Sequence, residues 1–596
     1  MKQEKIRGDL FVDLLEAPFS RRGSFLAFAN DVKGEDLIGK CTLWLCNCRI
    51  NMNAMSSDLN ASNGFRQVKL ELVKDGKTLP ALISTTPYEV VLESRHGSVR
   101  FCIGERKLVM CGGEDGLTLR VTPTPRFLLP SVVDLMEDCG ALVAGFGVTR
   151  LLMMPVVGSL RAGAGFADME PDENGVLRLA LEEYMIDPVH RAAKDYPDYD
   201  ACVKSVKADF DGYCARLFPS LPAAYEPKRL QALWQTWNMT VEPDGESDYK
   251  HTMVKMIHSI FEAAFVWQQP MQAVWLSSDL ELAWNIFISG FDYLDANGRM
   301  VDALGYRASV GGEGLKPPVH GMALLWLMKR RDFASIPKES KETVWEGMRR
   351  WTEYFMKFRD KDHDGVAEFQ NILETGWEDA PYYDTIGCPC ASPDLNAFIA
   401  LSMEAVAALG RDIGKPEEIC AEWEKRSAEL VGKIVEKFWD GERWFAFNAR
   451  TGERSNTSTI PLYVPLILGR RLPQEIIDKS IEFMFGPDGF STPYGLATEG
   501  VTSDYFKHGF TQGSIIVPAE FIMVLALEAC GRSDLAARVA NDYCAALRDG
   551  GFYHIHNALT GKGDRSLTAF GEPGLFWSAW ASSCYLYLAS EYGNSI

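Results

Sequence analysis

Two patterns of hydrophobic residues divide the chain. Before about residue 190, apolar residues occur in short runs rich in Val, Leu and Thr, and turn sequences such as Asp-Gly and Gly-Gly separate them. This spacing predicts an antiparallel β-sandwich over residues 1–190, followed by a helical linker over residues 191–225. The runs lie at 41–50, 66–73, 88–94, 99–105, 107–111, 117–123 and 149–157.

From residue 226 onward the apolar residues follow a helical period. Connections after odd-numbered helices are long, about 20–35 residues, whereas those after even-numbered helices are tight links. Twelve helices that pair in this way predict an (α/α)6 barrel over residues 226–596, with the long loops at one end. An open solenoid is the alternative, but the sequence shows no repeated unit. The helix candidates are 229–239, 268–276, 279–294, 319–330, 340–358, 392–410, 416–439, 459–469, 473–485, 514–531, 534–547 and 575–592. The predicted fold class is therefore an α+β protein of two domains.

Composition narrows the choice of partner. The net charge of -20 argues against nucleic acid or an anionic membrane as the main partner. No run of about 18 apolar residues and no signal-peptide pattern occurs, so we expect a cytoplasmic protein without a membrane span. Aromatic residues make up 11% of the chain, including 15 Trp, and flat aromatic faces suit sugars. A neutral substrate fits this net charge. We expect no cofactor, and the sequence leaves a homo-oligomer open.

The longest predicted loop carries candidate acid chemistry. Its segment Glu374–Pro381 places Trp377 beside the carboxylates Glu378 and Asp379. An apolar neighbour raises a carboxyl pKa by desolvation, which is what a general acid requires near neutral pH. The loop between the last two helices lies half the ring away and offers the opposing groups Glu572, Asp564, His554 and His556.

The chain resembles a known family through a series of motifs. Glu374–Pro381 is similar to the Glu-Ser-Gly-Trp/Met-Asp-x-Ser-Pro signature of glycoside hydrolase family 63 and of trehalases, of the mannosylglycerate-hydrolase-like type. The resemblance covers roughly residues 226–592 and implies an inverting glycosidase with an (α/α)6 barrel. The further matches, in chain order, are Lys316-Pro317-Pro318, Asp394-Leu395-Asn396-Ala397, Asn557-Ala558-Leu559-Thr560-Gly561 and Phe576-Trp577-Ser578-Ala579.

The chain departs from the family pattern at both catalytic positions. The resemblance places the general acid at Glu378, where the family has Asp, and Asp379 follows directly. At the position of the family's general base this chain has His554. The interpretations left open are that Glu572 is the base, that another carboxylate such as Glu499 or Asp504 is, that His554 itself is, or that there is none.

Two sugar-binding elements of the family are also altered. Its Trp-Asp pair corresponds to Trp267-Gln268, so an amide replaces a carboxylate. Its Trp-Arg-Gly-Pro-Ile-Trp element corresponds to residues 511–516, which read TQGSII and lose the Arg and both Trp. We therefore expect a shifted specificity.

The sequence predicts an exo-acting, inverting hydrolase of a small α-glucoside or related oligosaccharide, with Glu378 or Asp379 as acid and Glu572 as base. One alternative is a phosphorylase in which Lys562, Lys316 and Arg565 bind inorganic phosphate. Another is a carbohydrate-binding homologue without catalysis. The predicted substrate contacts are Trp267, Gln268, Gln269, Lys316, Trp377, Gln512, His554, His556 and Trp577.

Two clusters resemble metal sites. Asp360, Asp362 and Asp364 imitate the first half of a calcium loop, but position twelve is Asn371 instead of Glu, so a solvated turn is the preferred interpretation and calcium stays open. The Cys46/Cys48 and Cys388/Cys390 pairs lack matching partners at zinc spacing. We predict no metal site.

Overall fold

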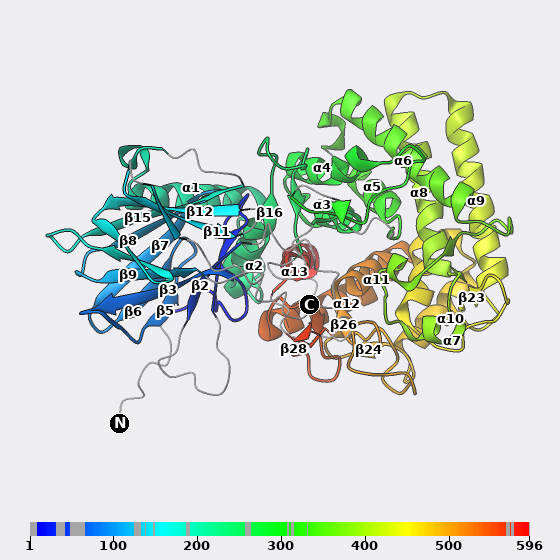
Figure 1. The fold of residues 1–596 in the computed structure, drawn as a ribbon. Coiled ribbons are helices and arrows are strands. Elements are labelled where there is room, and N and C mark those ends of the chain that lie inside the picture. Colours follow the sequence, from blue (N-terminus) through cyan, green and yellow to red (C-terminus); the bar gives the residue numbers. More distant parts are fainter. Residues whose placement is uncertain are drawn as a thin grey trace. The chain divides into compact units, whose positions relative to one another are not determined.

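The computed structural model describes residues 9–30, 42–47, 66–123, 133–136, 139–146, 149–185, 191–256, 264–306, 309–310, 315–330, 332–564, 566–567, 572–573 and 577–594. These residues form two compact units, the first within 1–215 and 234–241 and the second within 216–233, 242–256 and 263–596. The architecture is mixed α+β, with antiparallel sheets in the N-terminal part and helices in the C-terminal part (Figure 1).

The first unit contains two antiparallel sheets. One has the order β1-β2-β3-β9-β14-β13, with β4 on β3, and the other β10-β11-β12-β15-β8-β7-β6-β5. Side chains alternate in burial along β9, as expected for strands with one face on a core. All seven predicted runs contain strands. The bounds are β1 Leu26–Asn30, β2 Leu43–Asn47, β3 Arg66–Lys74, β4 Lys77–Thr78, β5 Leu82–Thr85, β6 Val90–Ser94, β7 Gly97–Glu105, β8 Leu108–Gly113, β9 Thr118–Pro123, β10 Val133–Met136, β11 Ala141–Phe146, β12 Thr149–Val157, β13 Ser159–Gly163, β14 Phe166–Glu170 and β15 Leu177–Tyr184.

The segment predicted as a linker contains the helix α1 (Tyr199–Leu217), most of which belongs to the first unit. A Cβ atom on Gly104 of β7 would lie 2.7 Å from Cys202 Sγ, and one on Gly112 of β8 would lie 3.1 Å from the Tyr199 ring. The two glycines therefore let α1 lie directly on the sheet.

The twelve predicted helices all occur. They correspond to α2, α3, α4, α5, α6, α8, α9, η8, α10, α11, α12 and α13 (Figure 1). The short helix α7 was not predicted. The bounds are α2 Glu226–Met239, η4 Val266–Gln268, α3 Gln269–Trp275, α4 Leu280–Ile288, η5 Ser289–Tyr293, α5 His320–Met328, α6 Lys338–Phe358, α7 Pro381–Ile386, α8 Pro393–Ile413, α9 Glu417–Phe438, η8 Ile460–Arg471, α10 Gln474–Phe485, α11 Val517–Ala529, α12 Ser533–Gly550 and α13 Ala579–Tyr592.

Local chemistry explains several of these bounds. Asp279 caps α4 by accepting a hydrogen bond from Leu282 N, and Pro270 lies in the first turn of α3. The eighth helix is of the 3-10 type and contains Pro465, which lacks an N–H. The predicted end of α8 at Gly410 is wrong. The helix continues to Ile413, and Gly414, with φ 82°, is the residue in the left-handed conformation.

Six helices of the second unit pack in a closed cycle. α3 contacts α5, α5 contacts α8, α8 contacts η8, η8 contacts α11, α11 contacts α13, and α13 contacts α3. These are the even-numbered helices of the prediction. α4, α6, α9, α10 and α12 pack on members of the cycle.

The segments that precede the cycle helices carry the predicted site residues. Short strands connect these segments: β18–β19–β20 before α3 and α5, β21–β22–β23 around α8, and β26–β27–β28 before α11 and α13. The bounds are β16 Thr240–Val241, β17 Met253–Val254, β18 Ala264–Phe265, β19 Ala303–Leu304, β20 Ser309–Val310, β21 Glu368–Phe369, β22 Cys390–Ala391, β23 Phe447–Asn448, β24 Ser491–Thr492, β25 Gly495–Leu496, β26 Ile515–Ile516, β27 Ile555–His556, β28 Gly563–Asp564, β29 Ser566–Leu567 and β30 Glu572–Pro573. None of the described helices combines the length and apolar character that a membrane crossing requires.

Candidate active site

A buried ion pair anchors the loop that carries the predicted acid. Arg359, which ends α6, donates to both carboxylate oxygens of Glu374, at 3.0 and 2.7 Å. Gln370 N donates to the same carboxylate at 2.7 Å. Because Glu374 is 1% exposed, this residue fixes the loop and has no free face for a substrate.

Trp377 is a second anchor of the loop. Its ring is 1% exposed, and its Nε1 donates to Asp394 Oδ2 at 3.0 Å. Burial raises the pKa of Asp394 to about 6, although Ser392 and Trp377 donate hydrogen bonds to it. Trp377 was predicted to contact the substrate; its buried ring and engaged N–H instead give it a structural role.

Asp379 ties this loop to the segment before α11. Its carboxylate accepts hydrogen bonds from Phe510 N at 3.1 Å, Thr511 N at 2.6 Å and Thr511 Oγ1 at 2.5 Å. Burial raises its pKa despite these donors. Since three donors occupy this carboxylate, Glu378 is the better placed of the two predicted acids.

Glu378 pairs with the buried residue Lys316. The Lys316 Nζ donates to Glu378 Oε1 at 2.5 Å and to the Leu373 carbonyl at 2.6 Å. Burial lowers the pKa of Lys316, but the carboxylates of Glu378 and Asp302 outweigh it, so the net shift is upward. Lys316 was predicted to contact the substrate or a phosphate ion; its ammonium is already paired.

Aromatic contacts connect this loop to the predicted base position. A Cβ on Gly376 would lie 2.9 Å from the Trp267 ring, and Trp267 packs edge-on against Trp580 with centroids 5.2 Å apart. His554 lies 5.5 Å from the Trp580 ring and stacks on Phe510 at 5.2 Å. The segments around Glu378 and His554, about 175 residues apart, therefore meet in one cluster.

Buried polar atoms without hydrogen-bond partners gather in this cluster. Among the described residues none donates to Gln268 Oε1 or Asp302 Oδ1, and neither Trp580 Nε1 nor His554 Nδ1 has a partner. Gln268 follows Trp267 directly, and the carbonyl of Asp302 accepts from Val266 N at 2.8 Å. Buried polar groups are seldom left unsatisfied, so a hydroxyl-rich ligand suits these atoms.

His554 is unsuited to act as the base. Burial, and then the neighbouring His556, lower its pKa to about 3. His556 Nε2 bonds to the Gly551 carbonyl at 2.9 Å, and burial lowers its pKa to about 4. This hydrogen bond gives His556, a predicted substrate contact, a partner within the protein backbone.

The other residues predicted to contact the substrate differ in how many partners their side chains already have within the protein. Gln269 uses its whole amide on the backbone of Val254 and Phe265, at 2.9–3.0 Å, and so positions the start of α3. Trp577 packs on Phe552 and is 7% exposed. Gln512 is half-buried in the segment that Asp379 holds.

Two carboxylates remain as candidate bases. The backbone of Glu572 lies in β30, paired with Leu567 of β29, and its side chain is outside the described residues. Glu499 is fully buried, and burial raises its pKa to about 7, whereas hydrogen bonds from Ser503 and from the backbone of Ser458 oppose the shift. Asp504 is exposed.

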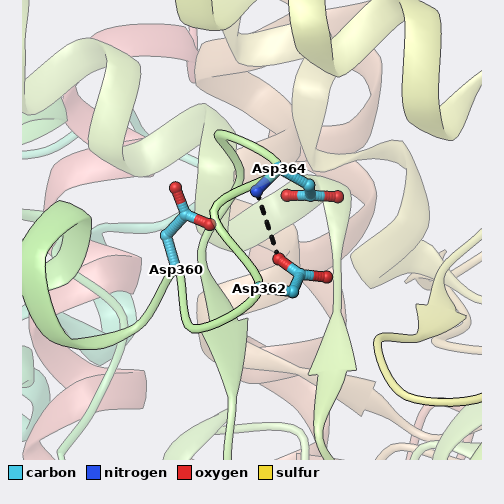
Figure 2. A group of neighbouring side chains, drawn as sticks. All are labelled: Asp360, Asp362 and Asp364. Carbon is cyan, nitrogen blue, oxygen red and sulfur yellow. Dashed lines mark hydrogen bonds between the residues drawn. The ribbon is translucent and has the colours of Figure 1, made fainter.

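Three aspartates lie close together in the turn after α6 (Figure 2). Three carboxylate oxygens, one from each of Asp360, Asp362 and Asp364, lie within 4.8 Å of one another. The turn's own N–H groups donate to all three side chains, and Lys437 Nζ lies 2.8 Å from Asp364 Oδ2. These contacts suit a closed turn, whereas calcium would need six or more oxygen ligands. The solvated turn and the calcium site both remain predictions.

The fold and the motif series define a class of enzyme, the glycoside hydrolases. Residues 275–578, just over half of the chain, match the family model described as mannosylglycerate hydrolase MGH1-like glycoside hydrolase domain. The chain belongs to this family and is a glycoside hydrolase.

Known relatives agree with the family. A mannosylglycerate hydrolase of Rubrobacter radiotolerans is 21% identical over 316 residues, which cover 42% of this chain and 70% of that protein. The family 63 mannosylglycerate hydrolase of Thermus thermophilus, solved with Tris and D-glycerate, is 17% identical, covers 61% of this chain and 99% of its own, and has a TM-score of 0.52. The same enzyme with Tris alone gives a TM-score of 0.51. The predicted resemblance is confirmed.

Proposed function

We propose that this glycoside hydrolase is exo-acting and inverting, and that it cleaves a small α-glucoside or a related glycoside. Its catalytic domain is then an (α/α)6 barrel over residues 226–596, preceded by a β-sandwich over residues 1–190, in a cytoplasmic protein. The closed cycle of six helices supports the barrel. The observation that carries the proposal is the buried cluster in which Gln268, His554 and Trp580 keep polar atoms free beside Glu378.

In this mechanism Glu378 protonates the leaving oxygen while a carboxylate on the opposite face of the sugar activates a water. The two carboxyl groups of inverting glycosidases lie about 6.5–9.5 Å apart to admit that water. Trp267, Gln268, Gln512 and His554 would contact the sugar. Glu572 is our assignment for the base, and Glu499 is the alternative because its carboxylate is buried and burial raises its pKa to about 7.

Turnover of a glycoside panel with and without inorganic phosphate tests the function. The panel contains small α-glucosides and, because of the names of the relatives, mannosylglycerate. We expect release of a free sugar at the same rate in both buffers. A sugar phosphate formed only with phosphate would establish the phosphorylase alternative. Sugars that raise the melting temperature while no substrate is turned over would establish the binding alternative.

Matched variants identify the base. Glu572→Gln is expected to lower kcat by roughly 10²–10⁴-fold, the usual contribution of a general base, whereas Glu499→Gln leaves it within about threefold. Added azide should restore turnover of Glu572→Gln, since azide attacks the anomeric carbon without losing a proton and gives a glycosyl azide. The reverse pattern, with Glu499→Gln inactive and rescued, would move the assignment to Glu499.

A further inference from the structure

Three charged side chains from three separate segments meet around the predicted proton donor. Lys316 lies just before α5, Glu378 lies in the loop before α7, and Asp302 directly precedes β19. Lys316 Nζ pairs with Glu378 Oε1 at 2.5 Å. The Asp302 carbonyl accepts a hydrogen bond from Val266 N at 2.8 Å, next to Trp267, whose ring lies against Gly376, two residues before Glu378. The charges of Asp302, Lys316 and Glu378 also influence one another. The trio thus combines one ammonium with two carboxyl groups.

Asp302 is a buried acid with one carboxylate oxygen that has no partner among the described residues. The residue is 9% exposed, and the oxygen is Oδ1. Burial raises its pKa to about 6; Lys316 opposes this shift, Glu378 adds to it, and Arg299 opposes it. A buried carboxyl without a structural partner, next to an ion pair, calls for a chemical explanation.

We propose that Asp302 is a positioning residue of the proton donor: its carboxylate balances the charge of Lys316 whenever Glu378 carries the proton destined for the leaving group. This inference rests on the proposed function, in which Glu378 is the acid. It assigns a role to a residue that none of the motifs contains.

Charge balance explains why the donor needs such a residue. With Glu378 ionised, Lys316 has a counter-ion 2.5 Å away. When Glu378 takes up a proton from solvent, that counter-ion is lost, and a buried ammonium without a partner is costly. Asp302 then supplies the negative charge. As the glycosidic bond breaks, its electron pair goes to the leaving oxygen, which takes the proton of Glu378, and the restored carboxylate pairs with Lys316 again.

Among the residues that the structure describes, three further charged groups act on the trio or lie next to it in the chain. Glu374 acts on Lys316, but its carboxylate is paired with Arg359. Asp379 lies next to Glu378 in the chain, and Phe510 and Thr511 donate to it. Arg299 faces Asp302 and, like Lys316, favours its ionised form.

The test is the pH profile of kcat/KM for Asp302→Asn and Lys316→Gln. Burial raises the pKa of Asp302 to about 6, so the neutral Asn removes more negative charge at pH 8 than at pH 5. In Asp302→Asn we expect the alkaline limb of the pH profile to move to lower pH by about one unit. The ratio of kcat/KM at pH 8 to that at pH 5 then falls about tenfold. Lys316→Gln removes a positive charge instead and should move the alkaline limb of the profile to higher pH. A structural role would not give opposite shifts.

Asp332→Asn, which changes an exposed aspartate of the same unit, is the control and should keep the wild-type profile. Titration of ¹³C-labelled carboxyl groups by NMR gives a second measurement that needs no substrate: Glu378 should lose its proton at lower pH in Asp302→Asn than in the wild type. Superimposable profiles and titrations would overturn the inference. A wild-type protein that turns over no glycoside would instead overturn the proposed function, whatever the titration shows.

Discussion

Glu378→Gln loses turnover on glycosides with poor leaving groups, by roughly 10²–10⁴-fold in kcat, while the melting temperature stays within a few degrees of the wild type. The amide cannot donate the proton that the leaving oxygen requires. It can still accept the hydrogen bond from Lys316, so the loop keeps its place. Initial rates and thermal unfolding of the purified variant check both parts.

A comparison of substrates separates acid catalysis from binding. A glycosyl fluoride needs little protonation to leave, so the loss in Glu378→Gln should shrink by at least about tenfold on that substrate. Asp384→Asn is the matched control, because Asp384 is an exposed carboxylate only six residues further along. It should keep wild-type rates. Wild-type turnover by Glu378→Gln would contradict the assignment of the acid.

Arg359→Met is expected to lower the free energy of unfolding by about 3–5 kcal/mol, because it leaves Glu374 as an unpaired charge in the interior. Glu374 is 1% exposed, and both hydrogen bonds that its carboxylate accepts from side chains come from Arg359. Since this pair holds the loop that carries Glu378, activity should fall as well. Urea denaturation followed by tryptophan fluorescence measures the first effect.

Arg349→Met tests whether burial is the cause. Arg349 also lies on α6 and forms ion pairs with Glu346 and Glu353, but these are surface contacts. Its loss should cost less than about 1 kcal/mol. Equal costs for the two variants would show that the Glu374 pair is no more important than a surface salt bridge.

The sequence predicts the helices of the second unit well because their signals are local. The helical period, the cap at Asp279 and the proline in the first turn of α3 each depend on neighbouring residues. The prediction of the end of α8 failed for the same reason. Gly410 and Gly414 both carry the local signal for a helix C-terminus, and only packing decides between them.

The candidate site was predictable in its motifs but not in its contacts. Sequence order suggested that the loops around Glu378 and His554 face each other, and the aromatic contacts through Trp267 and Trp580 agree. No motif pointed to Asp302, whose importance comes from burial and from charges distant in the chain.

Trp377 and Gln269 show the opposite error. Both belong to segments that resemble a sugar site, yet Trp377 donates to Asp394 and Gln269 bonds to the backbone of Val254. A sequence gives residue types at these positions, but it does not give the partners that already occupy them.

The most direct test of the proposed mechanism is the anomeric form of the sugar first released, followed by ¹H NMR in the first minutes of turnover. An inverting enzyme acting on an α-glycoside releases the β-anomer, and the α-anomer then appears only as mutarotation proceeds. We predict this result for the wild-type protein without phosphate. Release of the α-anomer first would contradict the account, because retention requires a covalent intermediate on a carboxylate that this mechanism does not contain.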